Sequence, residues 1–459
     1  MSRLLPDSQF WVARLFIRLR IVRHMKAKLK LARIALLGAS FLLLVVGVGY
    51  CARSASQKSQ VKAKLERIRA DGFPVTLAEL NDWYEEPPPS QNAAEVYGVA
   101  FANMAAVPST APSFLAQNQR ALEGLHQGAK LEKSRYPVDF KDFSGSAEPF
   151  SSLEHLSKLK LGVQLLSQEA VARVAQGRLD LATDSLVDGL RLARSLEQEP
   201  VLLSHLVQVA SEKIMYRGLE SVLNRRSLPA AQLAKLQAAF RDAETGHTLR
   251  QALAGERCLA ISIFQSPAPL KSLMESAGSG PESSGADSFS NLGLQAYTKT
   301  PKFTEDFIYY LDMMAETIDE CSKPGPLPVA QLVDRLRSGV AEARQRGLNF
   351  SFMLFGGVYP LAVLQSTEGV AVLRVAQTVL AIERFRGRHN NELPASLSQL
   401  IPEYLEAAPT DPFDGQALRY VQLQPRGYMV YSIGRDFVDN HGAATAAGAN
   451  PDLVCSVAH

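Results

Sequence analysis

The hydrophobic pattern of the chain begins with nineteen consecutive residues without a charge, 34–52. A helix rises 1.5 Å per residue, so this run would span about 28 Å, close to the thickness of a bilayer's hydrocarbon core. Arg33 and Arg53 bound the run. Because lipid cannot satisfy backbone polar groups, a segment this apolar is expected to be helical. The pattern therefore predicts one transmembrane helix at 34–52, with the lipid bilayer as a partner.

A second pattern, apolar residues at three- and four-residue spacing, runs from 152 to about 264. This spacing places apolar side chains on one face of a helix. The first such face includes Leu156 and ends at Gly177. A second face follows, and a third begins at Pro200. Short connections place neighbouring helices antiparallel. We therefore predict a helical domain at 53–265.

One part of this region permits an alternative. Residues 177–192 resemble the second helix of a tetratricopeptide repeat, but Glu169 and Arg173 stand where the preceding helix needs apolar or aromatic residues. No second copy follows at the repeat's period of about 34 residues, and a lone repeat cannot bury its apolar face. A plain helical bundle is favoured over a repeat array.

The next segments change character. Gly, Ser and polar residues dominate 276–288, so a linker or long surface loop is predicted at 266–300. A helical continuation is expected at 301–365. Within it, 348–364 is a second uncharged run, but Gly356-Gly357 interrupts it. We expect buried core or a helix junction there, not a second span.

In the last part of the chain, the spacing of apolar residues changes from that of helices to that of strands. A long helix and a proline-rich loop precede two strand-like runs, 418–421 and 428–434, which a turn near 425–427 would join into a hairpin. We predict an α+β module at 366–442 and a tail at 443–459. The fold class is thus mainly α, with a single N-terminal transmembrane helix, a helical bundle body and a small C-terminal α+β module containing a β-hairpin.

Charge is distributed unevenly along the chain. Residues 1–33 contain nine Lys or Arg and one acid, whereas the remainder contains 40 basic and 45 acidic residues. A body with net negative charge offers no electrostatic footprint for nucleic acid. Positive residues are retained on the cytoplasmic side, and those before the span outnumber the six within 53–69. We expect a basic cytoplasmic tail at 1–33 and an extracytoplasmic body, single-pass in the cytoplasmic (inner) membrane.

The N-terminal region also has features of a signal sequence. From Met25 onward, basic residues precede the apolar run in the order typical of a signal. Ala52-Arg-Ser54 offers a small-x-small cleavage site, but the run is long for a removed peptide. An uncleaved signal anchor is therefore expected.

Four widely separated cysteines form no C-x-x-C pair. Metal binding through them is not expected. An oxidising compartment would allow one disulfide among Cys258, Cys321 and Cys455, and buried or free thiols are the favoured alternative.

The C-terminal module carries a series of short motifs. Leu393-Pro-Ala-Ser-Leu397 follows the long helix, Asp411-Pro-Phe413 precedes Leu418-Arg-Tyr420, and the series ends in Tyr431-Ser-Ile-Gly-Arg-Asp436. In this order and spacing, about 75 residues resemble the C-terminal half of the major pseudopilin of type II secretion. A pseudopilin joins its hydrophobic helix directly to its globular head. Here some 310 residues intervene, so assembly into a pilus is not expected.

The resemblance implies a metal site. Acidic residues of the final loop hold calcium in pseudopilins, and the matching positions are Asp436 and Asp439, with Asn440 adjacent. Two carboxylates, an amide and backbone carbonyls could supply the oxygens that calcium prefers. Asp and Asn also cap turns through their own backbone. Calcium binding and turn capping both stay open here, and no other cofactor is expected.

Further motifs lie earlier in the chain, at Leu77–Tyr84, Pro87-Pro88, Asn92–Ala94 and Leu253–Arg257. Through them the whole chain resembles the large uncharacterised membrane-anchored proteins of planctomycete and verrucomicrobial type. This resemblance implies no activity.

Few residues indicate a reaction. Glu244-Thr-Gly-His247 has the Glu-x-x-His spacing of di-iron bundles, but those sites need two such motifs and no second occurs. Glu256 and Arg257, inside an apolar helix, favour an internal ion pair over a catalytic dyad. His155 and His205 have no suitably spaced nucleophile, and the chain contains no P-loop, dinucleotide fingerprint or H-E-x-x-H motif. The acidic residues of 312–320 are expected to form a solvated face.

Three hypotheses of function follow. The leading one is a membrane-anchored extracytoplasmic scaffold or protein-interaction protein of the cell envelope, with envelope or secretion proteins as partners and no identifiable reaction. The first alternative is an accessory component of a type II secretion or pilus-like system. The second alternative is an enzyme of unrecognised class, which would require a pocket where at least two members of one set converge. That set is Glu244, His247, Glu256, Arg257, Asp312 and Glu316.

Overall fold

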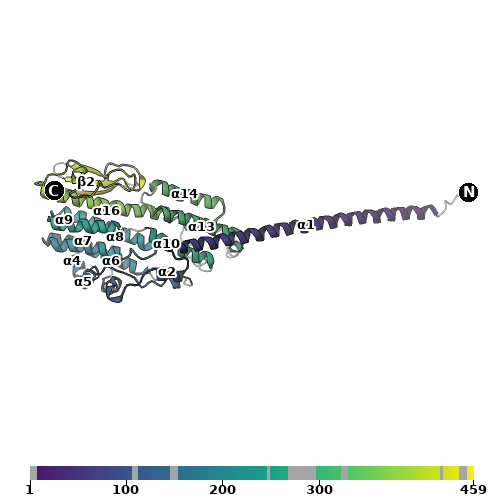
Figure 1. The fold of residues 1–459 in the computed structure, drawn as a ribbon, viewed down its shortest axis with the longest axis horizontal. Coiled ribbons are helices and arrows are strands. Elements are labelled where there is room, and N and C mark those ends of the chain that lie inside the picture. Colours follow the sequence, from purple (N-terminus) through teal and green to yellow (C-terminus); the bar gives the residue numbers. More distant parts are fainter. Residues whose placement is uncertain are drawn as a thin grey trace.

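The molecule consists of a helical body from which one long helix, α1 (Ser8–Ala70), projects (Figure 1). α1 begins at its end far from the body, and the strand β2 (Gly427–Ser432) lies at the opposite end of the body. This computed structural model describes residues 8–105, 112–144, 153–245, 249–266, 296–321, 329–423, 427–443 and 452–458.

Most of the body is helical, which confirms the mainly α fold class. Its first half contains α2 (Leu77–Trp83), η1 (Pro89–Gln91), α3 (Ala93–Ala102), α4 (Pro112–Gln117), α5 (Gln119–Gly128), η2 (Phe140–Ser144), α6 (His155–Ala175), α7 (Leu179–Arg194), α8 (Leu202–Leu223), α9 (Ala230–Thr245) and α10 (Leu249–Gln265), where η marks a 3₁₀ helix. Its second half contains α13 (Pro301–Glu320), α14 (Val329–Gln345), α15 (Asn349–Phe355), α16 (Tyr359–Arg388), η5 (Leu397–Leu400) and η6 (Gly434–Asp436).

Two clusters of buried apolar side chains hold the body together. The first joins α3 and α5–α9 to the C-terminal sheet, and the second joins α10 and α13–α15 to the end of α1. α16 contributes to both: residues from Tyr359 to Ala371 belong to the second cluster and those from Val372 to Phe385 to the first. This helix therefore crosses the boundary that the sequence analysis set between 365 and 366.

The C-terminal sheet is antiparallel, in the order β1 (Arg419–Leu423), β2 (Gly427–Ser432) and β3 (Leu453–Val457). Tyr420 pairs with Val430, which pairs in turn with Cys455. The predicted hairpin is confirmed, although 424–426 of its turn lie outside the described residues. The sheet has one strand more than predicted, because β3 comes from the segment 443–459 that was assigned to a tail. β3 is short and no turn signal links it to β2, so its pairing could not be inferred locally.

Several local predictions can be checked. The predicted helix junction within 348–364 is confirmed, since α15 ends before Gly356-Gly357 and α16 begins at Tyr359. By composition α15 and α16 together could span a membrane, but half of the apolar window is buried in the body. Most of the predicted linker, 267–295, lies outside the described residues. All four cysteines are free thiols, and Cys258 and Cys455 are buried.

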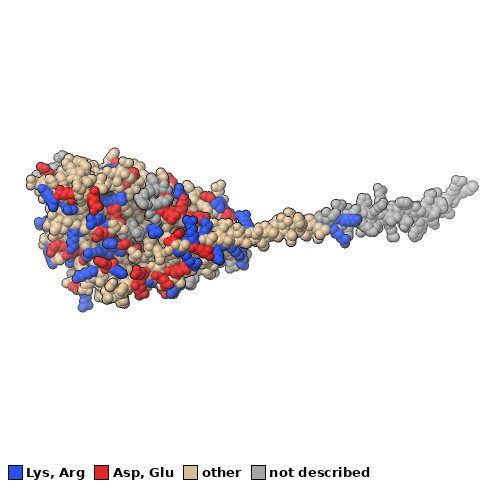
Figure 2. Space-filling model, in the orientation of Figure 1, with Lys and Arg blue, Asp and Glu red and all other residues tan. Residues whose placement is uncertain are grey.

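The environment of α1 changes sharply along its length. The side chains from Leu36 to Tyr50 lie outside the body and are exposed, and the helix is a candidate membrane span by length and composition. Figure 2 shows this stretch as an uncharged shaft leaving a body on which acidic and basic side chains are interspersed. From Gln57, only 8% exposed, α1 enters the body, and Val61 and Leu65 pack against the second cluster.

A close crossing of α10 over the segment before α8 gives a test of this packing. A Cβ added at Gly255 would lie 1.8 Å from the carbonyl oxygen of Pro200. We expect Gly255→Ala to lower the free energy of unfolding by about 3 kcal/mol, because backbone must shift to admit the methyl group. Thermal and urea unfolding of the full chain in detergent micelles would measure this change.

The matched control is Gly98→Ala in α3, where an added Cβ meets no atom within 4 Å. That variant should be neutral or more stable by up to about 1 kcal/mol, since alanine favours helix over glycine. Equal effects of the two substitutions would contradict the packing described for α10.

Candidate functional site

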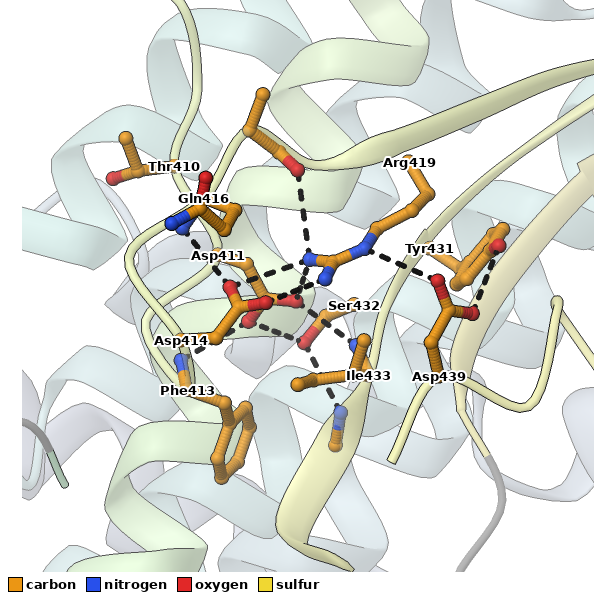
Figure 3. A network of polar contacts seen from close by, with 12 residues as sticks. Thr410, Asp411, Phe413, Asp414, Gln416, Arg419, Tyr431, Ser432, Ile433 and Asp439 are labelled. Atoms are coloured by element: carbon orange, nitrogen blue, oxygen red, sulfur yellow. Dashed lines mark hydrogen bonds and ion pairs between the residues drawn. The ribbon is translucent and has the colours of Figure 1, made fainter. Parts of the chain in front are cut away.

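A buried carboxylate, Asp411, fastens the proline-rich loop before β1 to the end of β2 (Figure 3). It accepts hydrogen bonds from the N–H groups of Phe413 (3.0 Å) and Ile433 (2.9 Å). The Ser432 hydroxyl (2.8 Å) and the Arg419 guanidinium (3.0 Å) complete its partners. The network joins two of the motifs that carry the pseudopilin resemblance, and its contacts serve to hold the loop.

Arg419 extends this network to two further carboxylates. It pairs with Asp414 at 2.5 Å and approaches Asp439 at 3.6 Å. Burial raises the pKa of Asp414, but hydrogen bonds from Arg419 and from the Gln416 N–H outweigh it, so the pKa lies below its ordinary value. The three aspartates are therefore gathered around a guanidinium, the geometry of an ion-pair network.

The predicted calcium residues lie together in the loop after β2, with their oxygens engaged by protein donors. Asp436 accepts a hydrogen bond from the Val438 N–H (3.1 Å), and Asp439 accepts one from the His441 N–H (2.9 Å). Both are Asx turns. The Asn440 amide donates to Asp436 (3.2 Å). No group of three or more His, Cys, Asp or Glu suited to a metal occurs among the described residues, and calcium binding stays a prediction.

The residues considered for chemistry do not meet. Glu244 binds Arg374 at 2.7 Å and thereby ties α9 to α16. Glu256 accepts a hydrogen bond from the Leu202 N–H (3.0 Å), and burial raises its pKa. Arg257 lies elsewhere, over the Phe73 ring at 5.0 Å. The predicted ion pair between Glu256 and Arg257 is wrong, because adjacent residues of a helix point in different directions.

The acidic residues of α13 also act separately. Asp312 contacts Lys64 of α1, and Glu316 contacts Arg335 of α14 at 2.5 Å. Both carboxylates are exposed, as predicted, whereas Glu320 is buried on the side that faces α14. His247 lies outside the described residues. The five described members of the set named for an enzyme therefore make separate contacts.

The body contains a polar cleft that sequence reasoning missed. Its volume is about 920 Å³, and it lies between the loop 129–134, the last turn of α7 and the segment that begins at Trp83. Its charged lining consists of Lys130, Lys133, Arg191, Arg194, Glu85, Glu132, Glu197 and Asp242. Because basic and acidic groups are balanced, the cleft suits a polar ligand carrying both charges, such as a protein segment, better than a polyanion.

The cleft offers binding groups, but one of its two serines, Ser195, is not activated. The Ser195 hydroxyl donates to the Leu192 carbonyl (2.7 Å) and contacts the Tyr136 hydroxyl (2.8 Å). Burial raises the pKa of Tyr136, so this phenol stays neutral. Neither contact is a base that could draw a proton from Ser195, and a nucleophilic serine needs one.

Behind the cleft lies Glu199, which is only 2% exposed. It contacts His155 (3.0 Å), the Ser204 hydroxyl (2.5 Å) and the Tyr84 hydroxyl (3.4 Å). The His155 ring also stacks on Tyr136 with 4.3 Å between centroids. These contacts join α2, α6 and the start of α8. His155 is thus a packed histidine paired with a carboxylate, which its sequence spacing did not reveal.

A second histidine network joins α5, α6 and α7. His126 contacts Asp188 at 2.7 Å through Nδ1 and Glu169 at 2.8 Å through Nε2. Glu169 also pairs with Arg173 at 2.5 Å. This explains why two charged residues stand where a tetratricopeptide repeat would need apolar ones. Burial lowers the pKa of His126, but the hydrogen bonds and charges of Asp188 and Glu169 prevail and raise it to about 9.

Comparison with protein-family models, curated proteins and solved structures finds no match to this chain. Its function is therefore inferred from α1, the cleft and the surface of the body.

The His126 network predicts a pH dependence of stability. The folded pKa of about 9 lies above the ordinary value of 6.5. Its stabilisation is therefore complete below about pH 6.5 and is lost as the pH rises through 9. We expect the wild type to lose about 2 kcal/mol more than His126→Gln over that interval, after allowance for solvent screening. Urea unfolding between pH 6 and 10 would measure it, and parallel stability curves would contradict it.

Proposed function

We propose that the protein is a membrane-anchored scaffold or protein-interaction protein of the cell envelope. It would be single-pass in the cytoplasmic (inner) membrane, with residues 1–33 inside and the body outside the cytoplasm. The observation that carries this proposal is the change of environment along α1. Its side chains are exposed and apolar from Leu36 to Tyr50, then packed in the body from Gln57.

The exposed part of α1 is better suited to lipid than to water. Phe41, Leu43 and Val46 are exposed by 68%, 72% and 61%. Each such residue favours the centre of a bilayer by about 0.3–0.6 kcal/mol. The helix satisfies its own backbone, so lipid imposes no polar cost there. The proposed span and the segment packed in the body belong to one continuous helix, so no loop separates the anchor from the body.

The body supports an interaction role. Its cleft presents basic and acidic side chains to one ligand, and the ammonium groups of Lys130 and Lys133 form no ion pair within the described residues. Envelope or secretion proteins with a polar segment of mixed charge are the proposed partners. The secretion-accessory alternative rests on sequence motifs alone, and the five described members of the set named for the enzyme alternative make separate contacts.

Charges placed in the span test the anchor. We expect the double variant Leu43→Arg/Val46→Arg to lose membrane retention, because each arginine at a helix centre costs about 3 kcal/mol. Carbonate extraction and flotation of membranes would measure retention. The matched control is Val421→Arg/Leu423→Arg, which adds the same charges to exposed positions of β1 and should stay bound. A wild-type protein found in the soluble fraction would refute the anchor.

The direction of insertion gives a separate prediction. Nine basic residues precede the span, so the C-terminus should lie outside the cytoplasm. Alkaline phosphatase fused after His459 should therefore be active in intact cells, while a reporter that works only in the cytoplasm should be silent. The reverse pattern would overturn the proposed orientation and leave the anchor itself intact.

A further inference from the structure

α1 reaches the body without a spacer. Arg53 is the first residue after the uncharged run, and its guanidinium already lies 3.3 Å from Glu305 of α13. One turn later Gln57 is buried. If the run 34–52 spans a bilayer, as proposed above, this end of the body meets the lipid headgroups.

The contacts between α13 and α1 show which part of the body lies next to the end of the span. Arg53 contacts Glu305, and Lys64 contacts Asp312, so both helices advance in the same direction. The first turns of α13 therefore lie beside the end of the span, and its later turns lead away from it.

α15 begins next to the first turns of α13. The Asp306 carboxylate accepts hydrogen bonds from the N–H groups of Phe350 (2.8 Å) and Ser351 (2.9 Å), the first turn of α15. Arg346, just before α15, pairs with Glu305 at 2.9 Å. The start of α15 is thus held by Asp306 and, through Arg346, by Glu305, which also contacts Arg53 at the end of the span.

The surface around α15 is apolar. Phe352 and Met353 are exposed by 37% and 41%, and Val358 and Leu361 by 50% and 44%. Outside α1, the other exposed large apolar side chains of the described residues are scattered or belong to the sheet. This apolar patch, Phe352, Met353, Val358 and Leu361, is interrupted by two glycines that add no polar side chain.

Basic groups rim the patch. Arg344 lies over the Phe352 ring at 5.7 Å and has no carboxylate partner among the described residues. Arg53, Arg346 and Lys302 gather around the carboxylate of Glu305, and Arg346 also pairs with Glu342 at 2.8 Å, so the three cations meet two carboxylates. Apolar side chains beside unneutralised cations are the composition of a surface that enters the interfacial layer of a membrane.

We propose that the patch of α15 and the start of α16 inserts into the interfacial layer of the same bilayer that α1 spans, with Arg344 at the lipid phosphates. The body would then be held at two points and could not swing about the end of the span. This inference rests on the proposed membrane anchor. Lipid is favoured over a second copy of the chain because the patch continues the surface on which the span ends.

Fluorescence quenching by lipid tests this contact. Met353→Trp and, as a matched control, Val421→Trp on the far end of the body would each be made in a chain carrying Trp11→Phe. The full chain would be reconstituted in phosphatidylcholine vesicles with and without brominated acyl chains. We expect the emission added by the Trp at 353 to fall by about half in brominated vesicles, since interfacial side chains reach the acyl boundary. The Trp at 421 should keep its emission.

The outcomes separate the two proposals. If the protein floats with the vesicles but the Trp at 353 is no more quenched than the Trp at 421, the patch does not meet lipid and the inference falls, while the anchor stands. A blue shift at 353 that grows with protein concentration and not with bromination would assign the patch to a second copy. Failure of the wild type to float would refute both. Val358→Trp serves as a second probe if Met353→Trp misfolds.

Discussion

The structure depends first on the burial of α16. Residues on nearly every side of this 30-residue helix are buried, from Tyr359 to Arg386. A helix that is apolar all round is stable only where water is excluded, and α16 meets this condition inside the body. Its first half packs with α13–α15 and its second half with α8, α9 and the sheet. α16 therefore joins the end of the body near α1 to the C-terminal sheet.

Two buried carboxylates hold irregular segments against these helices, and both do so with the same set of hydrogen bonds. Asp306 accepts two N–H groups and a hydroxyl at the start of α15, and Asp411 accepts two N–H groups and a hydroxyl where the proline-rich loop meets β2. Both side chains are fully buried. Backbone groups that secondary structure leaves unpaired are thus satisfied by charge-assisted bonds, which are stronger than neutral ones. Each carboxylate positions a segment more firmly than packing alone would.

Local patterns were sufficient for much of the fold. The helices around Leu156 and Gly177, the helix junction at Gly356-Gly357 and the strands around Tyr420 and Val430 all follow from the spacing of apolar and glycine residues. β3 could not be found this way, because its five residues are defined by pairing with β2. The extent of α16 was also underestimated. Its apolar residues continue through a proline at its second position, which a helix tolerates in its first turn.

The candidate site was much less accessible to sequence reasoning, for a physical reason. The cleft and its histidine networks are assembled from segments that lie far apart in the chain: His126 meets Asp188 and Glu169 from two other helices, and His155 meets Glu199 beyond α7. No spacing rule relates such residues. The one local signal was negative, namely that Glu169 and Arg173 violate an apolar repeat pattern. A charged pair at an expected core position indicates a charged partner, and here that partner is the half-buried His126, whose pKa is raised by Glu169 and Asp188.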